Sequence, residues 1–231
     1  MILGGLQRFS LIDYPGKTSA IVFTVGCNFR CGFCHNPELV IPRRNVTSYL
    51  PEARVFEFLE TRRGKLDGVV ITGGEPTIHP DLPDFLGRIK RMGFLVKLDS
   101  QGSRPQMFRK VLAQGLVDYI AMDIKGPLDK YGTIVRAPVD LDAIRESVSL
   151  IVGSGVDHEF RTTIVRSQLE PNDFERIGEL IAGARRYALQ KFLPSAKLLD
   201  PSFQRETTYT DAELDEIRER MLGYVGECFV R

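Results

Sequence analysis

Short apolar runs rich in β-branched residues alternate along this chain with longer amphipathic stretches. The runs predict strands over residues 19–25, 67–72, 94–98, 117–122, 158–165 and 191–194. The stretches between them predict helices over residues 51–63, 82–92, 105–115 and 141–152, with two more that begin near 172 and 210. This alternation is typical of βα units that build a parallel sheet. We therefore expect an α/β fold, and six units are too few to close an eight-stranded barrel.

Local signals place some of the helix ends. Asn172 with Glu175, and Thr210 with Glu213, have the spacing of N-terminal capping pairs. The segment 195–208 has neither strand nor helix periodicity and is expected to be the least structured part of the chain.

Length and charge limit the possible classes of protein. With 231 residues and 43% hydrophobic content, the chain suits a single domain over residues 1–231 with a full core. The formal charge of +1 gives no electrostatic case for binding nucleic acid or a membrane. No apolar run is long enough to span a bilayer, and Met1 leads into no signal-peptide pattern. We expect a cytoplasmic protein, because thiols stay reduced there.

Three of the four cysteines follow the first predicted strand. Cys27, Cys31 and Cys34 have the spacing C-x3-C-x2-C. Thiolate is the soft ligand that iron–sulfur clusters and zinc prefer. A cubane cluster with four irons needs four ligands, so three cysteines leave one iron open to bind a small molecule, as an open zinc position does in a catalytic site.

Other uses of these cysteines remain open at this stage. A structural zinc site would need His35 or Cys228 as its fourth ligand, and the chain lacks the paired C-x2-C units of zinc knuckles. A disulfide framework does not suit so long a chain with four cysteines. Cys228 is expected to be a small buried apolar residue, and no second cluster can be built from it alone.

The cysteine stretch closely resembles the signature of the radical S-adenosylmethionine (SAM) superfamily, which has an aromatic residue, here Phe33, before the last cysteine. The tail His35-Asn36-Pro37-Glu38 looks like that of activating enzymes for glycyl-radical proteins. The leader at residues 10–17, SLIDYPGK, is similar to that of anaerobic ribonucleoside-triphosphate reductase activating proteins, and it parallels the D-G-P-G leader of pyruvate formate-lyase activases.

This resemblance implies a fold, a cofactor and a reaction. The fold would be a partial (β/α)6 barrel, and the three cysteines would hold a [4Fe-4S] cluster. One electron from the reduced cluster would cleave bound SAM into methionine and a 5′-deoxyadenosyl radical. The radical would take a hydrogen atom from a glycine Cα of a partner protein, with anaerobic ribonucleotide reductase as the leading candidate. A flavodoxin- or ferredoxin-type protein would supply the electron.

Further candidate site residues follow the predicted strands, where a parallel sheet places its active site. They are Gly73, Gly74 and Glu75 after the second strand, Asp99 and Ser100 after the third, Asp123 and Lys125 after the fourth, and Arg161 within the fifth. Together with Phe33 and Asn36 of the cysteine stretch, they are the predicted cofactor-binding residues.

The resemblance gives these residues roles. Residues 73–76, GGEP, would bind the amino group of SAM through backbone carbonyls, and otherwise they form a tight turn. Residues 99–102, DSQG, resemble a D-T-N-G element that lies along the SAM ribose and methionine. Asp99 and Asp123 would repel each other unless a monovalent cation or Lys125 balances them; the alternative is a surface Asp123–Lys125 pair. Arg161 would bind the SAM carboxylate, or else pair with an acid on a helix.

Two positions bear on the partner. Ala196 stands where pyruvate formate-lyase activases have the histidine of L-P-Y-H, which argues against that assignment. Asp13 would face the partner's glycine loop, and the alternative is a turn residue. Other functions also stay open: a pyruvate formate-lyase-type activase, a carboxydeazaguanine synthase-like enzyme with a pterin-like substrate, or a non-catalytic metal-binding or electron-transfer protein.

Overall fold

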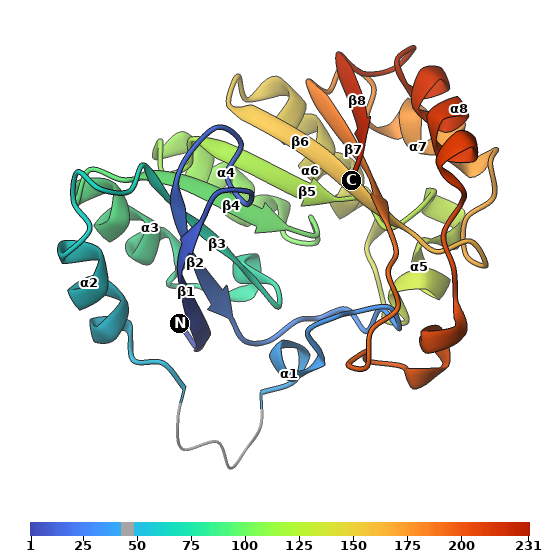
Figure 1. The fold of residues 1–231 in the computed structure, drawn as a ribbon. Helices are drawn as coiled ribbons and strands as arrows, with labels where there is room; N and C mark the ends of the chain where they lie inside the picture. The colour runs from blue at the N-terminus through green and yellow to red at the C-terminus, as the bar shows by residue number, and fades with distance from the viewer. Residues whose placement is uncertain (43–48) are drawn as a thin grey trace. The chain divides into compact units, whose positions relative to one another are not determined.

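The computed structural model describes residues 1–42 and 49–231, and its eight strands follow one another in the sheet in chain order (Figure 1). The strands are β1 (Leu3–Ser10), β2 (Ser19–Thr24), β3 (Gly68–Gly73), β4 (Leu95–Ser100), β5 (Tyr119–Asp123), β6 (Asp157–Ile164), β7 (Arg186–Lys191) and β8 (Glu227–Val230).

The helices lie between the strands. They are α1 (Pro37–Val40), α2 (Glu52–Glu60), α3 (Leu82–Arg91), α4 (Pro105–Ala113), α5 (Leu128–Val135), α6 (Leu141–Gly153), α7 (Asp173–Leu180) and α8 (Asp211–Met221), with short 3₁₀ helices η1 (Pro76–Ile78) and η2 (Pro201–Arg205). No helix in the described residues is long and apolar enough to cross a membrane.

The chain divides into two compact units. Unit 1 comprises residues 1–28, 38–100 and 106–120, and unit 2 comprises residues 29–37, 101–105 and 121–231. The cysteine stretch therefore begins in unit 1 and continues in unit 2.

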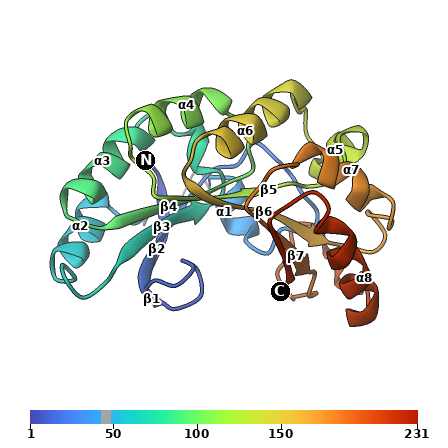
Figure 2. The same ribbon diagram turned by 90° about the horizontal axis from the view of Figure 1, so that it is seen from above.

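Unit 1 is built on β1 to β4. β1 pairs antiparallel with β2, whereas β2, β3 and β4 pair in parallel, with Thr24 opposite Gly73 and Ile71 opposite Leu98. The parallel strands are buried along most of their length, as expected where both faces of a sheet are covered. α3 and α4 lie on one side of these strands (Figure 2). This arrangement brings the carboxyl ends of β2, β3 and β4 to one edge of the unit.

Unit 2 is built on β6, β7 and β8, which pair in parallel. α7 and α8 lie side by side next to β7 and β8 (Figures 1 and 2). α8 begins at Thr210, whose hydroxyl accepts a hydrogen bond from the Glu213 N–H while the Glu213 carboxylate accepts one from the Thr210 N–H. The capping pair predicted at Thr210 is therefore confirmed.

Several predicted elements need correction. The predicted strand over 191–194 is wrong. The strand in this region is β7, which was missed because only three apolar residues lie between its charged ends. Asn172 is the N-cap residue of α7 as predicted, but its side chain makes no capping hydrogen bond; the Asp173 carboxylate accepts from the Glu170 N–H at 2.8 Å. β1, α5 and β8 were not predicted, so the sheet has two strands more than the six expected. The segment 195–208 contains η2.

Candidate functional site

The cysteine loop leaves β2 in unit 1 with its backbone held by α1. The Gly26 N–H donates to the Leu39 carbonyl at 2.8 Å, and the Cys27 N–H donates to the Val40 carbonyl at 3.0 Å. These two hydrogen bonds fix the backbone at the first cysteine before the chain passes into unit 2.

Gly73 and Gly74, at the end of β3, lie against the start of this loop. Gly73 has a φ of +117°, and a Cβ there would lie 2.4 Å from the backbone N and O of Thr24. A Cβ on Gly74 would lie 2.2 Å from the Gly26 carbonyl oxygen. Gly73 is thus in close contact with the end of β2 and Gly74 with the cysteine loop, and neither position can carry a side chain without displacing its neighbour.

Glu75 is fully buried, and its carboxylate links the ends of β3 and β4. Oε1 accepts hydrogen bonds from the Thr77 N–H at 3.0 Å, the Thr77 hydroxyl at 2.5 Å and the Ser100 hydroxyl at 2.8 Å. The Glu75 N–H donates to the Gly26 carbonyl at 2.7 Å. The side chain of Glu75 thus holds the ends of β3 and β4 together.

Asp99 and Ser100 lie at the end of β4. Asp99 accepts from the Lys97 ammonium at 2.6 Å, and Lys97 is almost completely buried with its Nζ 5.9 Å from the ring centre of Tyr119. A buried ammonium needs a carboxylate partner, and Asp99 is that partner. The expected repulsion at Asp99 is thus balanced inside unit 1.

The second and third cysteines lie in unit 2. Cys31 is buried and Cys34 is half-buried, and the Cys34 N–H donates to the Cys31 carbonyl at 3.1 Å. Burial raises the pKa of the Cys31 thiol, and Lys125 opposes that rise. Phe33 is buried between the two cysteines, with the Lys125 Nζ 5.8 Å from its ring centre, whereas Asn36 is exposed.

Asp123 is paired with two cations in unit 2. Its carboxylate accepts from Arg161 Nε at 2.8 Å and from Lys125 Nζ at 3.0 Å. Burial raises the pKa of Asp123, but Arg161 and Lys125 outweigh burial and hold that pKa at about 2. The Lys125 pKa is raised, because Asp123 outweighs the desolvation of the ammonium. One partner of Arg161 is thus an acid on β5.

The donor set fits a soft metal centre. None of the three motif cysteines is in a disulfide, and Cys31 and Cys34 are close in sequence within unit 2. Cys27 is four residues before Cys31, so chain length alone keeps their Cα atoms within about 15 Å of each other. The described residues contain no group of three His, Cys, Asp or Glu side chains already gathered as a metal site. The ligand assignment therefore rests on thiolate chemistry and spacing.

Sequence reasoning missed several residues that contact the cysteine loop in unit 2. The Tyr131 ring packs on Phe29 at 6.3 Å, and Phe203 packs on Phe33 at 6.3 Å. Asp200 and Arg136 form an ion pair next to Phe203. The Asp200-Pro201 step is a helix-start signal in the sequence, but nothing in it indicates which loop the helix would contact.

Two other predictions concern residues outside the strand ends. Cys228 is buried on β8, as expected, and burial raises its pKa to about 12. Asp13 accepts a hydrogen bond from the Ser10 hydroxyl in the turn between β1 and β2. The next residue, Tyr14, packs against Gly68 at the amino end of β3. The structure thus favours the turn interpretation of Asp13, at the strand ends opposite Glu75.

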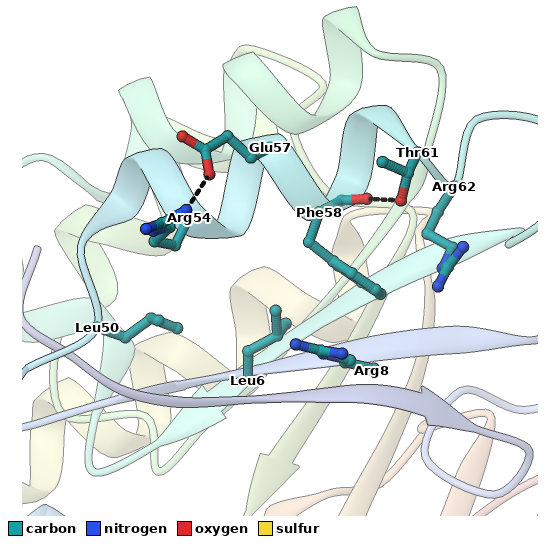
Figure 3. Close-up of a pocket in the computed structure, with 8 residues that line it drawn as sticks. All are labelled: Leu6, Arg8, Leu50, Arg54, Glu57, Phe58, Thr61 and Arg62. Carbon is teal, nitrogen blue, oxygen red and sulfur yellow. Dashed lines mark hydrogen bonds and ion pairs between the residues drawn. The ribbon is translucent and has the colours of Figure 1, made fainter.

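A surface hollow of about 580 Å³ lies between β1 and α2 in unit 1 (Figure 3). Figure 3 shows Phe58 pointing from α2 toward Arg8 on β1, and the Arg8 and Arg62 guanidinium carbons lie 5.9 and 5.0 Å from its ring centre. The hollow contains none of the predicted site residues.

Comparison with known proteins agrees with these features. A family model for the radical SAM superfamily matches residues 21–181. A relative from Methanocaldococcus jannaschii, named with reservation as a glycyl-radical enzyme activating enzyme, is 30% identical over 235 residues, which cover 100% of this chain and 95% of the relative. The pyruvate formate-lyase-activating enzyme of Clostridium pasteurianum is 28% identical over 131 residues, 54% of each chain. The 7-carboxy-7-deazaguanine synthase of Methanopyrus kandleri is 30% identical over 132 residues, 49% of this chain and 52% of that one.

Solved structures support the fold. SuiB from Streptococcus suis, bound to S-adenosylmethionine, aligns with a TM-score of 0.69 at 13% identity over 91% of this chain and 49% of SuiB. This chain spans about half the length of SuiB, and the likeness concerns the fold alone. The expected α/β fold with a parallel sheet of the open, partial-barrel type is confirmed. Because the family model covers more than half of the chain and the M. jannaschii relative aligns along its whole length, this chain belongs to the radical SAM superfamily and is an enzyme of the glycyl-radical activating type.

Proposed function

We propose that this chain activates an anaerobic ribonucleoside-triphosphate reductase by generating a glycyl radical on it. The observation that carries the proposal is the C-x3-C-x2-C-H-N sequence at residues 27–36, in a chain that aligns end to end with a relative of the activating type. In this proposal residues 1–231 act as one radical SAM domain, and Cys27, Cys31 and Cys34 hold the cluster.

A bound [4Fe-4S] cluster would supply the electron that cleaves SAM reductively and starts radical chemistry at the partner's glycine. The protein's own part begins with its thiols, which must lose their protons to become ligands. Metal binding would offset the burial that keeps Cys31 protonated, and Lys125 lies where its charge favours the thiolate. The buried Phe33 excludes water beside these two groups.

The remaining residues would bind SAM. The backbone carbonyls at Gly73, Gly74 and Glu75 are proposed to accept hydrogen bonds from the SAM amino group. The Glu75 carboxylate is already hydrogen-bonded to Thr77 and Ser100. Asp99 and Ser100 are proposed to contact the ribose. Arg161 is proposed to bind the SAM carboxylate, because the planar fork of a guanidinium matches the geometry of a carboxylate.

A monovalent cation near Asp99 and Asp123 remains a prediction. Each carboxylate already faces a protein cation, Lys97 for Asp99 and Lys125 with Arg161 for Asp123, which reduces the electrostatic need for another. Titration of SAM binding in K⁺ against tetramethylammonium buffers would test it, and equal affinities in both would remove the cation from the site.

The choice of partner rests on two sequence features. The leader at residues 10–17 resembles that of anaerobic ribonucleotide reductase activating proteins, and Ala196 lacks the imidazole found in pyruvate formate-lyase activases. We also propose a flavodoxin- or ferredoxin-type electron donor and an oxygen-poor cytoplasmic setting, because cysteines that are in no disulfide stay reduced only under reducing conditions.

The test uses two candidate partners side by side. The anaerobically reconstituted protein would be incubated with reductant, SAM and either an anaerobic ribonucleotide reductase or a pyruvate formate-lyase, and each mixture examined by EPR. A glycyl doublet with the reductase, absent when the reductase's radical glycine is replaced by alanine, is expected. A doublet with pyruvate formate-lyase alone would overturn the choice of partner.

A carboxydeazaguanine synthase-like activity is the second candidate, because the M. kandleri enzyme of that name matches about half of this chain. It would turn over a pterin-like small molecule without any protein partner. Product formation from that substrate, in the absence of a glycyl doublet with either protein, would favour it. Iron and sulfide analysis would separate both candidates from a zinc protein.

A further inference from the structure

A segment from late in the chain runs along the cysteine loop within unit 2 (Figure 1). We call residues 193–205, between β7 and the end of η2, the strap. The Asp200 N–H donates to the Gly32 carbonyl at 3.0 Å, and the Leu199 N–H donates to the Cys34 carbonyl at 3.1 Å. His35 Nε2 lies 2.8 Å from the Leu193 carbonyl. The backbone on both sides of Phe33 is thus hydrogen-bonded to the strap.

The aromatic side chain of the strap packs on the same loop. Phe203 is buried, with its ring 6.3 Å from that of Phe33 and 6.5 Å from that of Phe192. A Cβ on Gly32 would lie 2.4 Å from the Phe203 ring. Gly32 therefore lets the loop approach the Phe203 ring more closely than any other residue would.

Arg136, at the end of α5, holds the strap in place. Its guanidinium donates to the Asp200 carboxylate at 2.5 Å and lies 5.1 Å from the Phe203 ring centre. The same carboxylate caps η2 by accepting from the Ser202 N–H at 2.9 Å. A second bond joins α5 to the loop, because the Arg30 N–H donates to the Val135 carbonyl at 2.8 Å.

The backbone of Arg136 shows that its side chain matters. With a φ of +50°, Arg136 is the one non-glycine residue with positive φ among the described residues. Glycine or asparagine is the usual choice where a helix ends in this conformation. The strained backbone at Arg136 points to a use for its side chain, and the contacts to Asp200 and Phe203 supply one.

We propose that Arg136, Asp200 and Phe203 are positioning residues that hold the loop carrying Cys31 and Cys34 in the shape that binds the cluster. This inference rests on the proposed function, since it takes these cysteines to be cluster ligands. None of the three residues touches the metal; they act through the backbone of Gly32 and Cys34. Groups that orient metal ligands in this way typically change metal affinity about 10- to 100-fold when removed.

The first experiment compares two arginines of matched chemistry. Arg136→Gln removes the contacts to Asp200 and Phe203. Arg166→Gln removes an ion pair to Glu213 at 2.8 Å and a ring contact to Tyr209 at 4.6 Å, elsewhere in unit 2. Each full-length variant would be reconstituted anaerobically, and iron loss to a chelator followed by absorbance. Arg136→Gln is expected to lose iron about 10-fold faster than wild type, and Arg166→Gln at the wild-type rate.

Arg136→Gly separates positioning from folding. Glycine suits the positive φ, so the melting temperature of the apoprotein should not fall. Iron loss should nevertheless accelerate as in Arg136→Gln. A lower melting temperature with an unchanged rate of iron loss would show that Arg136 serves only the fold.

A rescue experiment tests the contact at Gly32. Gly32→Ala pushes a methyl group into the Phe203 ring, so the iron content after reconstitution should drop and the EPR signal of the reduced cluster should broaden. Adding Phe203→Leu makes room for the methyl group, and the double variant should regain iron and the wild-type signal. Failure of the rescue, or a Gly32→Ala protein with wild-type iron content, would overturn the role of Phe203.

These outcomes are distinct from a failure of the proposed function. A wild-type protein that binds no iron and sulfide would overturn the cluster itself. A wild-type protein with a stable cluster, whose Arg136→Gln and Arg136→Gly variants release iron at the wild-type rate, would overturn only the role of the strap.

Discussion

The two units supply site residues of different kinds. In unit 1, the side chains of Glu75 and Ser100 form hydrogen bonds between strand ends, Gly73 contacts the end of β2, and Gly74 contacts the cysteine loop. In the proposed site, unit 1 contributes the backbone at residues 73–75 together with Asp99 and Ser100. In unit 2, Asp123, Lys125 and Arg161 form a charged group next to Cys31. In the proposed site, unit 2 contributes mainly charged side chains.

This difference gives an expectation for substitutions. A backbone site is sensitive to added volume and insensitive to loss of charge, because carbonyls stay in place when side chains change. A charged site responds in the opposite way, since each group holds the others ionised. Four predictions test this contrast, beginning with the largest effect.

The motif cysteines should be equally necessary although they lie in different units. Cys27→Ala in unit 1 and Cys31→Ala in unit 2 are each expected to abolish reductive cleavage of SAM, because three thiolates are needed to hold the cluster. Formation of 5′-deoxyadenosine, measured by chromatography, checks this. Cys228→Ala, on the buried β8, should retain cleavage. Activity in either motif variant would break the assignment of one shared cluster.

Volume should be costly at the backbone site of unit 1. Gly74→Ala places a methyl group 2.2 Å from the Gly26 carbonyl oxygen, and we expect a loss of about 3 kcal/mol in the free energy of unfolding. Gly5→Ala in β1 is the control, because its Cβ would meet only Phe23 at 4.0 Å. Urea unfolding of the two apoproteins measures the difference. A Gly74→Ala protein as stable as the control would refute the close approach.

Charge should be costly in unit 2. Asp123→Asn leaves Lys125 and Arg161 without their carboxylate, and we expect a loss of about 2 kcal/mol in stability together with weaker SAM binding. Asp118→Asn in unit 1 is the control, because Asp118 pairs with Lys90 at 2.7 Å and has no predicted role at the site. Calorimetric titration with SAM separates them. Equal SAM affinity in both variants would remove Asp123 from the site.

The smallest effect concerns the buried histidine that each unit contains. Burial lowers the pKa of His79 in unit 1 and of His158 in unit 2 below 6.5. His158 Nε2 accepts from the Arg185 N–H at 3.2 Å, and its Nδ1 lies 2.9 Å from the Val156 carbonyl, so the neutral ring is the bonded form. Below pH 6.5 the unfolded chain takes up these protons before the folded chain does. Stability contributed by the neutral rings is therefore lost as the pH falls through this range.

The sharper version of this prediction compares single variants. Between pH 7 and pH 5.5, the free energy of unfolding should fall less in His158→Gln than in the wild type. NMR titration of the imidazole signals should place the titration midpoint of wild-type His158 below pH 6.5. A midpoint above 6.5 would contradict the prediction. With three histidines in the chain, the signals can be assigned by substitution.

The sequence predicted the strand ends better than the contacts made there. Thr24, Gly73 and Ser100 end strands close to the predicted places, because a short run of mainly apolar residues precedes each of them. Once the sheet is parallel, its carboxyl ends must carry the conspicuous residues. The alternation of strands and helices and the cysteine motif could therefore be predicted from a single sequence.

The missed elements share weak local signals. β1 contains Gly4 and Gly5 with polar neighbours, and it pairs only because β2 is beside it. α5 contains Gly132 and ends in β-branched residues, which predict a helix poorly. The contact between Phe203 and Gly32 joins distant parts of the chain, and no periodicity indicates which ring a glycine will meet. The partners of buried charges, such as Lys97 for Asp99, likewise could not be predicted from the sequence alone.

The hydrogen bonds from Leu199 and Asp200 to the cysteine loop also have a consequence for how the protein is made. On the ribosome the three cysteines are added before the amides that brace their loop, since Leu199 follows Cys34 by 165 residues. At ordinary elongation rates the interval is roughly 10–30 s. During this time the thiols are present without their support, so a cluster delivered to the nascent chain would meet an unfinished loop, and delivery to the released polypeptide would meet a complete one.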